Sequence, residues 1–183
     1  MHSQIAQAIG LKHQLVALVL TDEKPEDAQQ FTPGRWGCVM SLFAGAAAKG
    51  KTAAIDKDTY GCWGGGVGLG FGEAYMRFPG GVECFTHFRS TGNRHSETGR
   101  QIAASMEGAA GQAFAEEFLE GERYVKSPEL VEKWVRQIPI TEIPTRYVLF
   151  KPLERIDPET ETPKIVVALA DPDQLSALVI LAN

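Results

Sequence analysis

Three cysteines and one histidine are the residues of this sequence best suited to chemistry. Cys38 and Cys62 stand apart in the chain, whereas Cys84 and His87 are separated by two residues. Thiolate sulfur and imidazole nitrogen are ligands for zinc and iron–sulfur clusters, and a C-x-x-H pair on one helical turn supplies two of them. The four residues therefore form a candidate metal site. A second close-spaced pair, which structural zinc sites usually have, is missing.

A narrower candidate site uses Cys38 and Cys62, with a bound cofactor or a further cysteine completing the coordination. Cys38 stands at the predicted start of a helix, where the helix dipole favours a thiolate. The alternative is that all three cysteines are buried thiols, because free cysteine is among the most buried residue types. A redox pair of Cys38 and Cys62 would lack the C-x-x-C spacing of thioredoxin-like proteins.

Cys62 lies in the densest glycine run of the chain, since residues 61–72 hold seven of the nineteen glycines. Such density marks backbone that turns sharply or is approached closely. Glycines four positions apart would give a helix one side of bare backbone. Neither a Walker loop nor a G-x-G-x-x-G spacing is present, which disfavours nucleotide binding. The residues predicted to bind a ligand or cofactor are Cys38, Cys62, Trp36, Trp63, Gly64, Gly65 and Gly68.

These residues predict a protein that binds a small ligand, a metal or a redox cofactor, with an iron–sulfur cluster, zinc and heme as the candidates. One alternative is an oxidoreductase that uses the bound cofactor. A second is a non-catalytic oligomerisation module with purely structural cysteines. In that case a homodimer interface would contain Gly64, Gly68 and Gly72.

Hydrophobic periodicity predicts the elements that must position this site. Helices are expected over residues 3–14, from Cys38 to Gly50, over 82–90, over 102–119 and from Ser127 to about residue 138. A last helix begins at Asp171, and it is expected to be buried because its residues are apolar almost all round. Strands are expected over residues 15–21, 51–55, 147–151 and 165–170. This pattern gives an α/β (mixed α+β) fold, in which a small mixed sheet packs against helices in two or three layers.

Length and charge narrow the class of protein. A chain of 183 residues is long enough for one domain with a sizeable core, and one domain over residues 1–183 is the expectation. The formal charge of −5 disfavours nucleic acid as a partner. The longest early apolar run, Leu15–Leu20, is too short for a membrane span or a signal peptide. The expected compartment is the cytoplasm.

Several short strings of the sequence resemble a prokaryotic family known as domain of unknown function 169. They are Trp36-Gly37-Cys38, Gly61-Cys62-Trp63-Gly64-Gly65, Gly121-Glu122-Arg123-Tyr124 and Asp171-Pro172-Asp173-Gln174. Cys38 and Cys62 match cysteines of that family, whereas Cys84 and His87 do not. The resemblance spans nearly the whole chain and implies no activity, because the family is functionally uncharacterised. It also implies that the native domain extends past Asn183 with a further cysteine.

Overall fold

The computed structural model describes residues 1–72, 74–139 and 141–182. The chain divides into two compact units, of which unit 1 comprises residues 1–69 and 143–183 and unit 2 comprises residues 70–142. Unit 2 is thus inserted in the sequence of unit 1. The composition of the sequence changes at neither boundary, and the expectation that one folding domain covers the chain stays a prediction.

Unit 1 is built on a four-stranded sheet in the order β2-β3-β1-β4. In chain order it contains α1 (Gln4–Ala8), β1 (Val16–Thr21), α2 (Val39–Lys49), β2 (Ala53–Ile55), α3 (Trp63–Gly68), β3 (Tyr147–Pro152), the 3₁₀ turn η2 (Leu153–Arg155), β4 (Ile165–Val167) and α8 (Pro172–Ala182). Paired strands run antiparallel, and an isolated bridge between Gln29 and Ala53 is parallel. The predicted α/β class, with a small sheet packed against helices, is confirmed.

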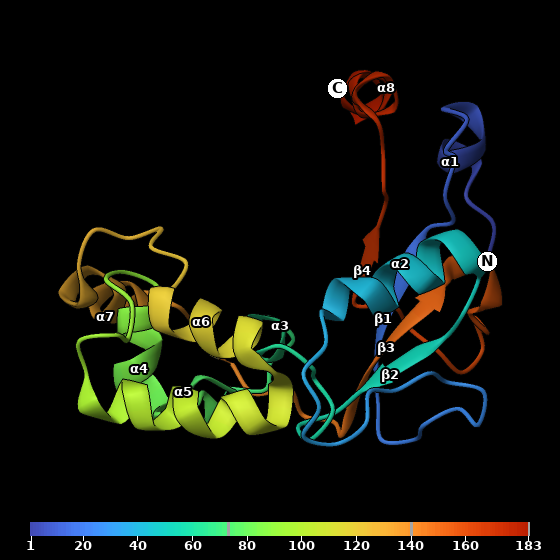
Figure 1. Cartoon of the computed structure of the whole chain (residues 1–183). Helices are drawn as coiled ribbons and strands as arrows, with labels where there is room; N and C mark the ends of the chain where they lie inside the picture. Colours follow the sequence, from blue (N-terminus) through green and yellow to red (C-terminus); the bar gives the residue numbers. More distant parts are fainter. Residues whose placement is uncertain (73, 140, 183) are drawn as a thin grey trace. The chain divides into compact units, whose positions relative to one another are not determined.

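The two faces of the sheet belong to different parts of the core, because side chains alternate along each strand. The register places Val19 and Ala54 on either side of Leu149, and all three are buried in one apolar cluster. On the opposite face, the ring of Phe150 meets the ring of Phe43 edge to face at 5.6 Å between centroids. Phe43 belongs to α2, which lies across the strands in Figure 1. Helix α2 is therefore anchored on the sheet.

Unit 2 is helical in its described residues. It contains the 3₁₀ turn η1 (Ala74–Arg77), α4 (Gly81–Phe88), α5 (Glu97–Ala110), α6 (Gln112–Glu120) and α7 (Pro128–Gln137). Its core holds a cluster of phenylalanine rings, in which the centroid of Phe78 lies 5.3 Å from Phe85 and 5.9 Å from Phe118. Asn93 is fully buried, and its Nδ2 donates to the carbonyl oxygens of Cys84 and Phe118. This amide therefore ties α4 to α6.

Two helix predictions are wrong in extent. The helix expected over residues 3–14 is only α1, because the backbone turns at Gly10, whose φ is 62°. The single helix expected over residues 102–119 is instead the pair α5 and α6, because Gly111, at φ 94° and ψ 158°, leaves the helical region between them. The segment 82–90, whose pattern allowed either helix or strand, forms α4 as predicted.

The prediction that the last helix is buried is also wrong. Leu175 and Ile180 of α8 are 56% and 73% exposed. An apolar sequence indicates that burial of the helix would be favourable, but it does not show which other element would cover the helix. No helix in the described part of the chain has the length and apolarity needed to cross a membrane.

Candidate functional site

Cys38 and Cys62 each occupy the position directly before a helix. Cys38 is the N-cap of α2 and is exposed, and Cys62 is the N-cap of α3 and is half-buried. Both have extended backbone angles, and neither side chain makes a capping hydrogen bond. Each thiol is therefore left available for other chemistry.

The residues that precede the two cysteines touch each other. A Cβ on Gly37 would lie 2.5 Å from Cε1 of Phe31, and one on Gly61 would lie 2.6 Å from Cε2 of the same ring. The Gly61 Cβ would also overlap the carbonyl oxygen of Gly37. Opposite edges of one ring thus rest on two glycines, and any larger residue at either would push the loops apart.

The residues that follow the two cysteines meet as well. A Cβ on Gly65 would lie 2.6 Å from Cγ1 of Val39 and 2.9 Å from Sγ of Cys62. Val39 is the first residue of α2 and Gly65 lies in the first turn of α3. The starts of the two helices are therefore packed together, which places Cys38 and Cys62 at one junction of unit 1. We call this region the paired-cysteine junction (residues 37–39 and 61–65).

A buried polar network fixes the loops that lead into the junction. Asp56 and Thr59 are 8% and 4% exposed, and the Thr59 hydroxyl donates to Oδ1 of Asp56 at 2.7 Å. Nε2 of Gln30 donates to Oγ1 of Thr59 at 2.9 Å. The backbone N–H of Gly34 donates to the carbonyl oxygen of Asp58 at 3.4 Å. These bonds join the loop before Cys38 to the turn that follows β2 and leads to Cys62. The end of β2 therefore helps to position both cysteines.

Gly64 and Gly68 present bare backbone on α3. A Cβ on either would meet no atom within 4 Å, and both residues are exposed. Neither has a positive φ. Gly65 between them is required by packing, whereas Gly64 and Gly68 are required neither by packing nor by backbone angle. The bare glycine side that a helix in this run would have is therefore present at Gly64 and Gly68, whereas Gly72 lies outside α3.

The aromatic residues that lie near the glycine run in the sequence fall in different places in the structure. Trp36 is 58% exposed, and Trp63 is the half-buried first residue of α3. Phe71 and Tyr75 are buried residues of unit 2, where the Tyr75 ring lies 4.5 Å from that of Phe85. Tyr75 is therefore a core residue of its own unit.

Cys84 is a packed thiol of unit 2. It is 1% exposed, and its sulfur lies against the backbone of Gly80, with Ile102 beside it. Burial, with a smaller contribution from Glu83, raises the pKa of the Cys84 thiol. A thiol kept neutral in this way is a poor nucleophile and a poor metal ligand.

His87 lies beside a second histidine. Its Nδ1 is 3.1 Å from Oγ1 of Thr91, and its ring meets the ring of His95 at 4.5 Å between centroids. Burial, followed by the charge of His95, lowers the pKa of His87, while Glu83 and Glu129 oppose this shift. The imidazole is thus held toward its neutral form.

The four ligands predicted for one metal are split between the units, with Cys38 and Cys62 in unit 1 and Cys84 and His87 in unit 2. Across the described residues, no three side chains among histidine, cysteine, aspartate and glutamate are grouped to hold a metal. What the structure brings together is the pair Cys38 and Cys62.

Sequence reasoning missed Phe31, Gln30 and Asp56 as positioning residues. A signal that could have identified the junction is the dipeptide Gly-Cys, which occurs at positions 37–38 and 61–62. No periodicity in the sequence identifies Phe31, whose ring rests on both glycines.

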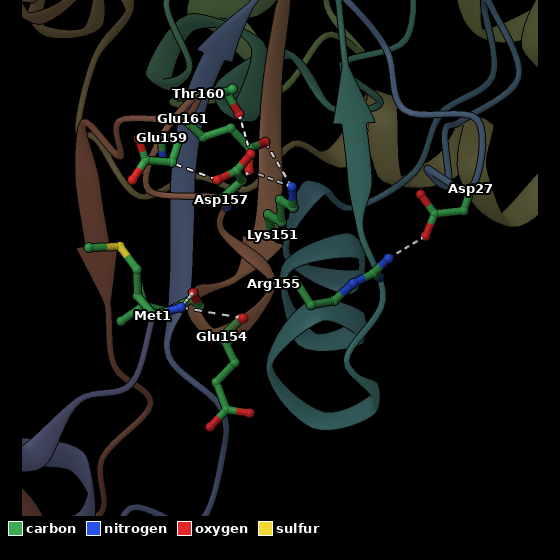
Figure 2. Close-up of polar contacts among 10 residues, drawn as sticks. Met1, Asp27, Lys151, Glu154, Arg155, Asp157, Glu159, Thr160 and Glu161 are labelled. Carbon is green, nitrogen blue, oxygen red and sulfur yellow. Dashed lines mark hydrogen bonds and ion pairs between the residues drawn. The ribbon is translucent and has the colours of Figure 1, made fainter.

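A second polar cluster closes the loop between β3 and β4. Nζ of Lys151 donates to both carboxylate oxygens of Glu161 at 2.7 and 2.6 Å, as Figure 2 shows. The carboxylate of Asp157 accepts from the backbone N–H of Glu159 and from the Thr160 hydroxyl, and these bonds lower the pKa of Asp157. The charged groups of this cluster are paired with one another, so we interpret the cluster as stabilising the loop.

Unit 1 also has a cavity of about 470 Å³ beside α1, lined by residues of the first fifteen positions together with Leu153 and Glu154. Two of its side chains already have partners: Lys12 pairs with Asp171 at 2.7 Å, and Nδ1 of His2 lies 3.5 Å from Oε1 of Glu154. Neither Cys38 nor Cys62 lines it.

The family model described as DUF169, an uncharacterised ArCR family, matches residues 4–183. The resemblance suggested by the glycine and cysteine strings is thereby confirmed. No protein of curated function and no solved structure matches the chain.

Proposed function

Because the chain belongs to the DUF169 family, whose activity is uncharacterised, we propose from its own geometry that unit 1 binds a small ligand or redox cofactor beside Cys38 and Cys62. The observation that carries the proposal is the contact of Gly37 with Gly61, which sets the two cysteines at adjoining helix starts. Exposed and half-buried thiols without capping bonds are suited to soft ligation or to redox exchange.

The open glycines support the same proposal. A glycine in a helix costs about 0.5–1 kcal/mol relative to alanine. Gly64 and Gly68 carry this cost although an alanine would fit at both positions. A ligand or partner that lies directly on the backbone of α3 would account for both residues.

The donor set limits the chemistry. Two thiolates supply half of the coordination of zinc or of an iron–sulfur cluster, so the other ligands would come from a bound molecule or from another segment of chain. A heme needs only one thiolate as its axial ligand. We further propose that the protein is cytoplasmic and that its partner is a small molecule, since the formal charge of −5 disfavours nucleic acid.

The test is elemental analysis and a UV–visible spectrum of protein purified without a histidine tag and without oxygen. The variants are Cys38→Ser, Cys62→Ser and the double variant, and the matched control is Cys84→Ala, which removes a thiol outside the junction. The expected result is a stoichiometric metal or chromophore that is lost in the double variant and kept in the control.

Two outcomes would reject the proposal. One is a colourless, metal-free protein that also shows no small-molecule ligand by native mass spectrometry. The other is a cofactor that is retained by the double variant but lost from Cys84→Ala, which would move the site to unit 2.

The two alternatives predict different behaviour. An oxidoreductase requires that the bound cofactor be reduced and reoxidised by a soluble substrate, and that turnover disappears with Cys38→Ser. A homodimer through the glycine side of α3 requires that Gly64→Leu produces monomers while leaving metal content unchanged.

A further inference from the structure

Helix α8 is an exposed apolar element of unit 1. After Asp173 it carries no charged residue through Leu181. Leu175, Ile180 and Leu181 are 56%, 73% and 60% exposed. An isolated helix of this length is marginal in water, so α8 requires tertiary or quaternary packing to be stable.

Two polar contacts join the start of α8 to the N-terminal segment of unit 1. Nε2 of Gln174 donates to the carbonyl oxygen of Gly10 at 2.7 Å, and Lys12 pairs with Asp171 at 2.7 Å. These polar contacts orient the helix, while Leu175, Ile180 and Leu181 stay exposed.

The strand that leads into α8 is an edge of the sheet. β4 pairs with β1 on one side through Val16–Val167 and Leu18–Ile165, and it ends the strand order. Ile165 and Val166 are 55% and 46% exposed, and Leu169 beyond the strand is 37% exposed. An uncovered apolar edge strand is a template for a further strand.

We propose that these residues form the contact surface of a homodimer, in which a second copy of this chain covers α8 and extends the sheet at β4. The surface consists of Ile165, Val166, Leu169, Leu175, Ile180 and Leu181, and we call it the α8–β4 surface. A twofold axis perpendicular to β4 pairs it antiparallel with its own copy. The dimer would then contain one continuous sheet of eight strands, two times the four in unit 1.

Area and charge favour a second copy as the occupant. Six aliphatic residues exposed to this degree offer on the order of 500 Å² of apolar surface. Ile165 and Val166 lie on opposite faces of β4, and strand pairing at this edge covers side chains on both faces, so the area approaches the roughly 800 Å² per partner of a standard interface. The six residues carry none of the chain's charged groups, so copies that meet at this surface do not bring like-charged side chains into direct contact.

The described residues of unit 2 offer no strand that could pair with β4, because they contain helices and no strand. A second copy of the chain has the same free β4 edge and can therefore pair with it.

Sedimentation velocity across a range of protein concentrations, in the presence of a thiol reductant, tests the proposal. The full chain is compared with Ile180→Glu on α8 and Val166→Lys on β4. The matched control is Met76→Glu, because Met76 is 68% exposed but lies in unit 2. Far-UV circular dichroism verifies that each variant keeps its secondary structure.

The expected result is a concentration-dependent dimer, with a dissociation constant raised about tenfold or more by each of the two surface substitutions. Met76→Glu and Gly64→Leu should leave that constant unchanged, which separates this dimer from one formed through the glycines of α3.

Any of three results would overturn the proposal. The first is a chain that stays monomeric at every concentration. The second is a dimer that Ile180→Glu and Val166→Lys leave intact or that reductant abolishes. The third is a monomer that floats with phosphatidylcholine vesicles through α8, which would make a lipid surface the occupant.

Discussion

Gly37 and Gly61 meet backbone to backbone, with opposite edges of the Phe31 ring resting on them. This relationship sets Cys38 and Cys62 at one junction of unit 1. Its first consequence concerns stability. Gly61→Ala should destabilise the protein more than Gly34→Ala, since both residues have a left-handed φ, 76° and 72°, but only Gly61 is crowded.

Urea denaturation of the two alanine variants measures the difference. Gly34→Ala should cost about 1–2 kcal/mol from backbone strain alone. Gly61→Ala should cost about 1–3 kcal/mol more, because its Cβ overlaps a carbonyl oxygen and a ring. Equal costs at the two positions would show that the glycines do not set the junction.

Alanine substitution of two neighbouring glycines of α3, Gly64 and Gly65, should change the stability of the protein in opposite directions. Gly64→Ala should stabilise the apoprotein by about 0.5–1 kcal/mol, because alanine favours the helix and meets nothing. Gly65→Ala should destabilise it, since the new methyl group would press on Val39 and Cys62. Thermal unfolding of both variants measures the sign. Gly64→Leu should in addition reduce cofactor content if a ligand lies on the backbone.

Thiol labelling should rank the three cysteines. Cys38 is exposed, Cys62 is half-buried and Cys84 is buried, so alkylation of the native protein should proceed in that order. Peptide mapping after timed exposure to iodoacetamide gives the three rates. Modification of Cys84 should require denaturant, and its labelling at a rate close to that of Cys38 would contradict the packing in unit 2.

The raised pKa of Cys84 also sets a pH dependence. Above the ordinary thiol pKa, the unfolded chain releases this proton while the folded protein keeps it. Stability should therefore fall as the pH rises from that value toward the raised one. Cys84→Ala should remove this alkaline loss, which urea titrations across the range can measure.

Mild acid should weaken unit 2 through His87. Its lowered pKa means that below the ordinary value of 6.5 the unfolded chain gains a proton before the folded protein does. Stability should therefore fall as the pH drops through that value and continue to fall to the lowered pKa. His95→Gln should raise the pKa of His87, because the charge of His95 contributes to the shift. NMR titration of the imidazole resonances tests both statements.

Replacing Lys151 of the cluster in the β3–β4 loop should lower the free energy of unfolding. Lys151 and Glu161 have side chains only 15% and 19% exposed, so Lys151→Met leaves a largely buried carboxylate without its cation. A loss of about 2–4 kcal/mol is expected. The control is Arg136→Met, which breaks an exposed pair with Glu132 and should cost no more than about 0.5 kcal/mol. If chemical denaturation shows the same loss of stability for Lys151→Met and Arg136→Met, the two ion pairs do not differ in their contribution to stability.

Much of the fold could be predicted because its signals are local. Ser127 and Pro128 specify the start of α7, and the hydroxyl of Ser127 accepts from the N–H of Leu130 as a cap should. The apolar β-branched run of β1 likewise identifies a buried strand. Such patterns act over a few residues, and no distant partner is needed to read them.

Other features depend on residues far apart in the chain. Phe31 contacts two glycines through loops whose paths the sequence does not specify, and Lys151 meets Glu161 only because the loop after β3 folds back. The exposure of α8 was misjudged for the same reason, since apolarity does not identify the covering partner. Gly111 was overlooked because apolar periodicity continues across it.

The strand order of unit 1 has a consequence for synthesis on the ribosome. β3 is the central partner of both β1 and β2, yet it is made only after the whole of unit 2. Until Tyr147–Pro152 leaves the exit tunnel, β1 and β2 have apolar edges and no central strand. Pairing across so long a stretch of chain is slow, and exposed edges invite aggregation. Nascent chains halted before β3 should therefore recruit chaperones, and their release should coincide with translation of this strand.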